Sequence, residues 1–490
     1  MQTTTLTALG IGAKIKSGDL TVADAVTSAL AAIDAKNKPI NAVLTVEERQ
    51  SLLATAADVQ AKIETGKLTS PLAGVPLGIK DNICTKNLRT TCASKMLDQF
   101  ISPYDATVIE RLRDAGVIPI AKLNLDEFAI GSTSETSFYG AVHNPWDLER
   151  VAGGSSSGSA AAVAAGLVCA SLGSDTGGSI RQPASHCGVT GFKPTYGVVS
   201  RYGAVAYVSS MDQIGPITRD VADAAAILDI ISGKDPLDGM SLELPPPRFS
   251  KQLNNDIAGK RIALPRESFG DNVDAAVQDS IRQTAEIFRA QGAVVEEIDL
   301  PFLEMLIPAY YIIATAEASS NLSKFDGVKY GHRAAGATNI EELYRKTRNE
   351  GFGNETIKRI LLGTFVLSSG YYDAYYKKAL QVKARIVQHF NDIFANFDAI
   401  LSPVAPTTAP HLGESLADSV KLYLADVFTA SANLVGLPAL SVPCGFDKKG
   451  LPIGAQIIGA HLADGLVLNL GHAFQTVTNF HKQMPKGGAF

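Results

Sequence analysis

The stretch from Ala141 to Gly215 constrains the fold most strongly, because glycine and serine dominate it while core-forming residues interrupt it. A stretch rich only in glycine and serine is typical of a flexible linker. Here the apolar runs Val163–Leu172 and Gly188–Val199 lie inside it, and charged residues are few. We therefore expect the stretch to be buried, with its backbone packed closely against another part of the protein.

Helical and strand patterns alternate through the rest of the chain. Amphipathic periodicity, with Thr21 as an N-cap of the first segment, predicts helices over Val22–Lys36, Asn41–Thr65, Asp105–Ala115, Asp274–Gln291 and Leu462–Asn479. Short apolar runs predict strands over Leu72–Ile79, Val117–Ala121, Arg261–Leu264, Val294–Ile298, Phe397–Ser402, Ala439–Val442 and Ile453–Ile458. This alternation predicts an α/β fold built around a sheet.

We expect one large domain over residues 1–490, since no internal repeat and no clear linker divides the chain. Within it we expect a helical N-terminal region at about 1–70 and a core at about 71–220. The segment Pro308–Leu380 carries few strand signals, so it is predicted to be a helical insertion that caps the sheet.

Composition argues against several classes of function. The formal net charge is −5, so no global positive field attracts nucleic acid or anionic lipid. The five cysteines are scattered without a CxxC pair, and the eight histidines form no HxxxH or HExxH pair, so no metal site is predicted. The first residues lack a basic region before their apolar residues, and the longest small-apolar run, Ala160–Leu172, is too short to span a bilayer. We expect a soluble cytoplasmic protein.

A lysine ends the apolar run Gly74-Val-Pro-Leu-Gly-Ile-Lys80. It could be an ordinary surface lysine at the end of a strand. Alternatively, the core encloses it. Burial disfavours the charged form of an amine and lowers its pKa, so an enclosed Lys80 could act as a base near neutral pH.

The run Gly153-Gly-Ser155-Ser156-Ser157-Gly158-Ser159 precedes an alanine-rich segment. It is neither a phosphate-binding Walker loop nor GxGxxG. It contains GxSxG centred on Ser156, the nucleophile-elbow pattern, but an elbow follows a strand, and Asp147–Ala152 is charged and turn-like. The remaining interpretations are a glycine-rich helix start, or such a start that also presents a hydroxyl group.

The run Gly173-Ser-Asp-Thr176-Gly177-Gly178-Ser179 combines successive glycines with a serine. It could be an ordinary tight turn. Successive glycines also allow backbone N–H groups to turn toward one point, beside the Ser179 hydroxyl. An acyl-transfer nucleophile needs this arrangement of attacking atom and oxyanion donors.

A serine nucleophile needs a base, which is usually histidine but can be lysine. The nearby histidines, His143 and His186, lie in no motif that resembles a triad. Lys80 and the two glycine-flanked serines therefore raise the hypothesis of a Ser–Lys hydrolase.

These three segments resemble the amidase signature enzymes, which use a Ser–cis-Ser–Lys triad. Ser155 follows Lys80 by 75 residues and Ser179 follows Ser155 by 24, as in the family pattern. The resemblance implies a large mixed β-sheet flanked by helices on both faces, with a helical insertion. It makes Lys80 the base, Ser155 the bridging serine in a cis peptide, and Ser179 the nucleophile. Thr176, Gly177 and Gly178 would form the oxyanion hole.

The resemblance extends over nearly the whole chain and is carried by further motifs. They are Lys122-Leu-Asn-Leu-Asp-Glu-Phe, His143-Asn-Pro-Trp-Asp-Leu, Ser200-Arg-Tyr-Gly, Asp212-Gln-Ile-Gly-Pro, Phe325-Asp-Gly-Val-Lys-Tyr-Gly, Lys358-Arg-Ile-Leu-Leu-Gly-Thr, Tyr371-Tyr-Asp-Ala-Tyr-Tyr, Asp426-Val-Phe-Thr and Gly436-Leu-Pro-Ala. A small departure is Ala152, where proline is frequent in the family. These motifs narrow the resemblance to the family members that hydrolyse glutamine for tRNA-dependent amidation.

Members of that group bind free glutamine, a zwitterion, so the pocket needs a cation for the carboxylate and an anion for the ammonium. The resemblance assigns these roles to Arg359 and Asp426, with a tyrosine that matches Tyr310. The neighbouring Tyr311 is an alternative for that tyrosine. From composition alone, Arg359 and Asp426 would be ordinary solvated charges.

The same resemblance implies an assembly of three different subunits. Ammonia from glutamine would travel to a B subunit, which handles Glu-tRNA(Gln), activates it with ATP and magnesium, and converts it to Gln-tRNA(Gln). A small C subunit would bind alongside. The resemblance therefore implies no cofactor and no metal in this chain, and contact with no membrane.

Two other interpretations remain open. A stand-alone amidase acting on another carboxamide would use the same triad. The glutamine-binding roles of Arg359 and Asp426 would distinguish a glutaminase from such an amidase. A non-catalytic scaffold with a relic site would have lost one of Lys80, Ser155 and Ser179, and all three are present.

Overall fold

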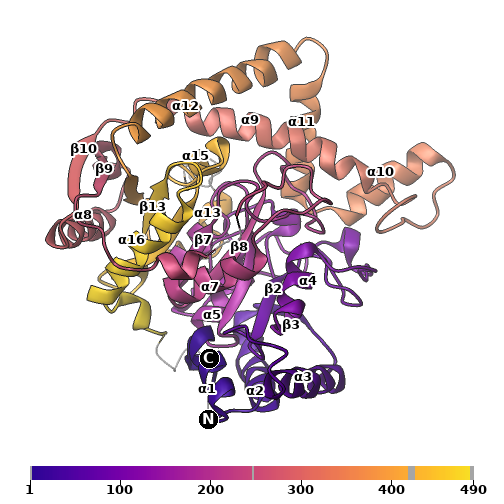
Figure 1. The fold of residues 1–490 in the computed structure, drawn as a ribbon. Helices are drawn as coiled ribbons and strands as arrows, with labels where there is room; N and C mark the ends of the chain where they lie inside the picture. Colours follow the sequence, from indigo (N-terminus) through magenta and orange to yellow (C-terminus); the bar gives the residue numbers. More distant parts are fainter. Residues whose placement is uncertain (1–2, 246–247, 418–424, 486–490) are drawn as a thin grey trace.

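The computed structural model describes residues 3–245, 248–417 and 425–485. Its main sheet contains β1 (Val43–Val46), β2 (Pro76–Lys80), β3 (Ile118–Leu123), β6 (Ala170–Asp175), β7 (Thr190–Lys193), β8 (Gln213–Thr218), β9 (Arg261–Pro265), β10 (Val294–Ile298), β11 (Ala399–Pro403), β12 (Ala439–Phe446) and β13 (Pro452–Gly459). These eleven strands lie in the order β1-β3-β2-β6-β8-β7-β12-β13-β11-β9-β10. Figure 1 shows β2 beside β3 and, at the opposite end of the sheet, β9 beside β10. A second sheet pairs β4 (His143–Asn144) with β5 (Asp147–Val151).

The main sheet is mixed, as expected for the α/β class. Strand β2 pairs in parallel with β3 and β6, whereas β8 pairs antiparallel with β6 and β7. Helices cover both faces. A Cβ atom at Gly454 of β13 would meet Ser185 of one helix, and a Cβ atom at Gly459 would meet Val467 of another. Positions five residues apart on a strand point to opposite faces. The predicted fold class is therefore confirmed.

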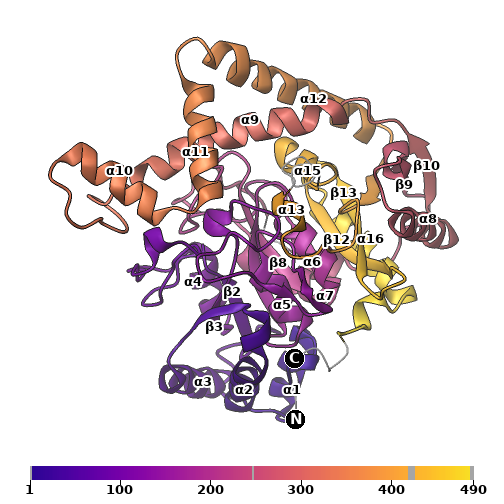
Figure 2. The same cartoon turned by 180° about the vertical axis from the view of Figure 1, so that it is seen from behind.

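Most predicted elements are present within a few residues of their predicted ends. Within the described ranges, the α-helices outside the insertion are α1 (Ala8–Ser17), α2 (Val22–Ile40), α3 (Arg49–Glu64), α4 (Thr107–Asp114), α5 (Ser157–Ala164), α6 (Arg181–Cys187), α7 (Val221–Ile231), α8 (Ala275–Ala290), α13 (Glu414–Ala417), α15 (Ala430–Val435) and α16 (Asp464–Val477). In Figure 2, which views the molecule from behind, α1, α2 and α3 lie together at the end of the sheet that carries β3.

The predicted helix over Asn41–Thr65 is wrong at its start. Asn41 adopts the left-handed conformation with φ 58° and ends α2, and the following residues form β1 before α3 begins. Strand β1 pairs antiparallel with β3, with Val43 opposite Leu123. Its Val-Leu-Thr-Val sequence favours a strand, and the longer helical pattern after it concealed this signal.

The Gly/Ser-rich stretch is buried, as predicted, and it contributes three central strands, β6, β7 and β8. Every residue of these strands is buried. The turn-like interpretation of Asp147–Ala152 is wrong, because its first five residues form β5 and pair with β4. This hairpin leads directly into the loop that carries Ser155 and Ser156, before α5 begins at Ser157.

The helical insertion is present but begins earlier and ends later than Pro308–Leu380. It contains α9 (Leu303–Asn321), α10 (Ile340–Gly351), α11 (Asn354–Leu367) and α12 (Lys378–Phe394). Pro308 lies inside α9 rather than at its start. Figures 1 and 2 show these helices across one side of the molecule, so they cover that side of the sheet. Among the described residues, no helix has both the length and the apolar character needed to cross a bilayer.

Candidate active site

Lys80 ends β2, which lies between β3 and β6 in the main sheet, and its side chain is 0% exposed. Its Nζ donates hydrogen bonds to Oγ of Ser155 at 2.8 Å, to Oγ of Ser156 at 2.8 Å and to the carbonyl oxygen of Ser174 at 3.2 Å. The surface-lysine interpretation is therefore wrong, and the core encloses this amine.

Burial lowers the pKa of Lys80 from its ordinary value of 10.5 to about 7. The carboxylates of Asp126, Asp175 and Asp212 act in the opposite direction, but their combined effect is smaller than that of desolvation. A substantial fraction of the amine is therefore neutral near pH 7 and can accept a proton.

Ser155 lies in the loop between β5 and α5, and the Gly154–Ser155 peptide bond is cis. The Gly154 amide donates to the side-chain oxygen of Gln182 at 2.8 Å. The Ser156 amide donates to the carbonyl oxygen of Ser179 at 3.0 Å. These bonds join the loop between β5 and α5 to α6 and to the loop that carries Ser179.

Ser156 is not a nucleophile elbow, although β5 does precede it. Its hydroxyl donates to the carbonyl oxygen of Ser174 at 3.0 Å and accepts from the Ser174 amide at 3.2 Å and from Lys80. Because these contacts occupy the hydroxyl group inside the core, it is not available to attack a substrate.

Asp175 organises the loop from Thr176 to Ser179. It forms an ion pair with Arg181 at 3.0 Å, and both side chains are fully buried. Its carboxylate also accepts from the amides of Gly178 at 2.8 Å and Ile180 at 3.0 Å. Burial alone would raise the pKa of Asp175, but the Arg181 guanidinium more than offsets this and holds it below its ordinary value.

The same contacts identify which amides around Ser179 are available. The amide of Gly178, a predicted oxyanion donor, already donates to Asp175, so this amide is occupied. The amides of Gly177 and Ser179 have no acceptor among the described residues, so they are free to bind a developing oxyanion.

A narrow pocket lies next to Ser179, and it contains all three predicted substrate-binding residues. Its lining includes Gly177, Ser179, Tyr207, Tyr310, Tyr311, Arg359 and Asp426, together with Ala129, Gly131 and Ser132. Tyr207 and the 129–132 segment were not predicted. Three of the pocket residues come from the helical insertion, which explains how the insertion contributes to the site.

Tyr310 and Tyr311 both line the pocket, but they have different contacts. The Tyr310 hydroxyl lies against the nucleophile loop, since a Cβ atom at Gly177 would come within 2.2 Å of it. The Tyr311 hydroxyl donates to Oδ2 of Asp426 at 2.9 Å, and the Arg359 guanidinium lies 5.0 Å from the centre of the Tyr311 ring. Tyr311 therefore connects the two charged residues, while Tyr310 faces the site of attack.

The two charges of the pocket are held in place by further contacts. Arg359 forms an ion pair with Glu355, one turn earlier on α11, at 2.7 Å. Burial raises the pKa of Asp426 to about 7, although the hydrogen bond from Tyr311 and the nearby Arg359 act to lower it. A bound ammonium group would favour the ionised form of this carboxyl group.

Asp212 is a further residue that sequence reasoning did not assign to the site. Its carboxylate accepts from the Thr176 hydroxyl at 2.6 Å and from the Tyr207 amide at 2.9 Å. It thereby joins the nucleophile loop to the pocket wall. The Asp212-Gln-Ile-Gly-Pro motif was a signal for it, but the motif by itself does not show what the carboxylate contacts.

Comparison with known proteins places this arrangement among known enzymes. The family model described as Amidase matches residues 24–468. The A subunit of a glutamyl-tRNA(Gln) amidotransferase from Agathobacter rectalis is 54% identical over 97% of this chain and 94% of its own length. The corresponding protein from Lachnospira eligens is 53% identical over 96% of this chain and 97% of its own length. The crystal structure of the same protein from Thermotoga maritima superimposes with a TM-score of 0.79 at 41% identity, covering 95% of this chain and 94% of that one.

The matched residues span the triad and pocket residues described above. The resemblance to the amidase signature enzymes is therefore confirmed. This chain belongs to the amidase family and, within it, to the group formed by the glutamyl-tRNA(Gln) amidotransferase A subunits.

Proposed function

We propose that this chain is the glutamine-hydrolysing A subunit of a glutamyl-tRNA(Gln) amidotransferase. The identity to two relatives of that name, 54% and 53% over almost the whole chain, supports this role. One observation carries the proposal: the buried amine of Lys80 contacts Ser155, beside a pocket that contains Ser179, Arg359 and Asp426.

Acylation begins with neutral Lys80. Its amine takes the proton of Ser155, and Ser155 takes the proton of Ser179 as the Ser179 oxygen attacks the side-chain amide carbon of glutamine. The amides of Gly177 and Ser179 bind the oxygen that becomes negative. Thr176 helps to hold the same loop in place, because its hydroxyl donates to Asp212. The proton then returns through Ser155 to the leaving nitrogen, and the C–N bond breaks to release ammonia.

Deacylation uses the same groups in a second round. The first round leaves a γ-glutamyl ester on Ser179. Water attacks the ester carbon, and its proton passes through Ser155 to Lys80. The C–O bond to Ser179 then breaks, and the Ser179 oxygen regains a proton through Ser155. The products are glutamate and free Ser179.

Recognition of glutamine relies on the charged end of the pocket. Arg359 pairs with the α-carboxylate, Asp426 pairs with the α-ammonium, and Tyr310 lies between this end and the nucleophile loop. A carboxamide without these charged groups loses both interactions, so the pocket favours glutamine over simple amides.

The ammonia is used in an assembly. In this proposal a B subunit handles Glu-tRNA(Gln), uses ATP and magnesium, and forms Gln-tRNA(Gln), and a small C subunit completes a heterotrimer in the cytoplasm. The net charge of −5 supports a division of labour in which the tRNA is held mainly by another chain. This chain itself then needs no cofactor and no metal.

The test is to co-express this chain with its B and C subunits and supply [amide-¹⁵N]glutamine, ATP, magnesium and Glu-tRNA(Gln). We expect the three chains to co-purify and ¹⁵N to appear in Gln-tRNA(Gln). A Ser179→Ala assembly should still transfer free ammonium but should no longer use glutamine. Fast turnover of many aliphatic or aryl amides by the isolated chain, without ¹⁵N transfer in the assembly, would favour the stand-alone amidase instead.

A further inference from the structure

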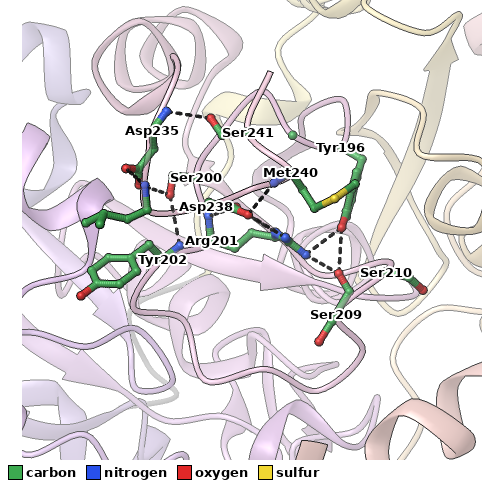
Figure 3. A network of polar contacts seen from close by, with 12 residues as sticks. Tyr196, Ser200, Arg201, Tyr202, Ser209, Ser210, Asp235, Asp238, Met240 and Ser241 are labelled. Carbon is green, nitrogen blue, oxygen red and sulfur yellow. Dashed lines mark hydrogen bonds and ion pairs between the residues drawn. The ribbon is translucent and has the colours of Figure 1, made fainter. Parts of the chain in front are cut away.

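Arg201 is the centre of a polar network outside the pocket (Figure 3). Its guanidinium forms a two-point contact with Asp238, from Nε at 3.1 Å and from Nη2 at 2.8 Å. The guanidinium also lies 4.9 Å from the centre of the Tyr196 ring, and Nη1 donates to the Tyr196 hydroxyl at 2.8 Å. These contacts fix the orientation of the guanidinium, because a planar fork bound on two edges has little freedom to rotate.

The oriented guanidinium holds one backbone carbonyl, that of Ser209. Nη1 of Arg201 donates to this oxygen, and the Tyr196 hydroxyl donates to it at 2.8 Å (Figure 3). Ser209 is not in a helix or strand, so no ladder of backbone hydrogen bonds holds its carbonyl. The side chains of Arg201 and Tyr196 take over that role.

The segment held at Ser209 continues into the pocket wall. Tyr207, two residues earlier, lines the pocket. Burial raises the pKa of Tyr207, and the Arg359 guanidinium is close enough to the Tyr207 side chain to act in the opposite direction. On its inner side, Asp212 holds the amides of Tyr207 and Val208 at 2.9 Å and 3.0 Å. The segment 207–209 is thus held by Asp212 at the amides of Tyr207 and Val208, and by Arg201 at the carbonyl of Ser209.

A third anchor connects the same segment to α9. The Ser210 amide and hydroxyl donate to the carboxylate of Glu317, and Nδ2 of Asn321 donates to the Tyr207 carbonyl at 3.1 Å. Glu317 lies seven residues after Tyr310, which is two turns along the same face of α9. The segment 207–210 therefore sits between α9, the helix that carries Tyr310 and Tyr311, and the Arg201 network.

We propose that Arg201 is a positioning residue for the glutamine pocket, which acts by fixing the Ser209 carbonyl and thereby Tyr207 against Arg359. The proposal rests on the proposed glutaminase function. A residue that only stabilised the fold would change the fraction of active enzyme, and therefore kcat, whereas misplacing a pocket wall changes KM for glutamine.

The decisive variant is Arg201→Lys in the three-subunit assembly. Lysine retains an ion pair with Asp238, but one ammonium group cannot reach Asp238, Tyr196 and Ser209 together. We expect the melting temperature to stay close to that of the wild type while KM for glutamine rises about tenfold and kcat changes less than about threefold. Tyr196→Phe keeps the stacking and removes one hydroxyl, so it should raise KM about threefold.

A matched control is Arg282→Lys on α8. Arg282 also lies over an aromatic ring, that of Phe269 at 4.6 Å, and pairs with an aspartate, Asp279, at 3.2 Å. We expect its KM to equal that of the wild type. If KM of the Arg201→Lys and Tyr196→Phe assemblies stays within about 1.5-fold of the wild type, or if only kcat falls, the positioning role is overturned. A wild-type assembly without glutaminase activity would instead overturn the proposed function itself.

Discussion

Two serines, rather than one, meet the buried amine of Lys80, each at 2.8 Å. Their environments differ. The Ser156 hydroxyl is bonded to the backbone of Ser174 as donor and as acceptor. The Ser155 hydroxyl has no hydrogen-bond partner other than Lys80 among the described residues. Ser155 is therefore free to pass a proton, while Ser156 holds the amine in place.

This difference predicts unequal losses on removing the two hydroxyls. Ser155→Ala should lower the glutaminase kcat by about 10³-fold or more, because the proton path is cut. Ser156→Ala removes one hydrogen bond to Lys80 and should cost about tenfold. Steady-state ammonia release from the assembled complex measures both. Equal losses in the two variants would contradict the assignment of Ser155 as the relay.

Gly177 has no room for a side chain, because Tyr310 lies directly against it. A Cβ atom there would lie 2.2 Å from the Tyr310 hydroxyl and 2.6 Å from the ring carbon that bears it. We expect Gly177→Ala to displace Tyr310 and the Gly177 amide together, and to lower kcat/KM for glutamine by about 10²-fold.

The control for this variant is Gly239→Ala, where a Cβ atom would meet nothing within 4 Å. Its kcat/KM should equal that of the wild type. If Gly177→Ala keeps wild-type activity, then Tyr310 is mobile enough to move aside and the tight contact does not matter for catalysis.

At the scale of elements, strands formed by short apolar runs could be predicted, including β12 and β13 near the middle of the sheet, whereas the Gly/Ser-rich strands β6, β7 and β8 could not. Strand β10 has the predicted ends, because Val294–Ile298 is a short run with strong strand preference. Strand β6 includes Gly173 and Ser174, which disfavour strands, and forms because its neighbours β2 and β8 cover both edges. Tertiary pairing overrides local preference there, and single-sequence patterns do not contain that information.

The crossing of α9 and α11 determines where the pocket charges lie. At Gly363 of α11, a Cβ atom would come within 1.9 Å of the Thr315 carbonyl oxygen of α9. The two helices, which carry Tyr310, Tyr311 and Arg359, therefore approach more closely than any side chain would allow.

We expect Gly363→Ala to push these helices apart and to raise KM for glutamine by about tenfold, with a lower melting temperature. The control is Leu362→Ala, at the neighbouring position, whose side chain is 43% exposed and should tolerate truncation. Calorimetry and steady-state kinetics of the assembled complex measure both effects. An unchanged KM in Gly363→Ala would show that the crossing does not set the pocket.

At the scale of the whole molecule, the site is assembled from distant parts of the chain. Arg181 contacts Asp175 nearby, but also the carbonyl of Thr429 and the side chain of Asn433, about 250 positions later. The three sequence motifs indicated the chemistry of the site. They could not predict these long-range contacts, since no local pattern encodes which distant polar group a buried arginine will meet.

We propose that the chain forms a single domain, because strands from both halves belong to one sheet. The outermost residues of the proposed range, 1–2 and 486–490, lie outside the described residues. In this arrangement Lys80 is fully buried, and its neutral form depends on the fold excluding water.

Catalysis depends on this buried, neutral amine acting as the base. The most direct measurement is the pH dependence of Ser179 labelling by an electrophilic glutamine analogue in the assembled complex, with and without Lys80→Gln. With a Lys80 pKa of about 7, the labelling rate should rise about tenfold per pH unit below pH 7 and level off above it. In Lys80→Gln this ionisation should vanish and the rate should fall by about 10³-fold. An unchanged profile in Lys80→Gln, or a rate within about tenfold of the wild type, would show that Lys80 is not the base.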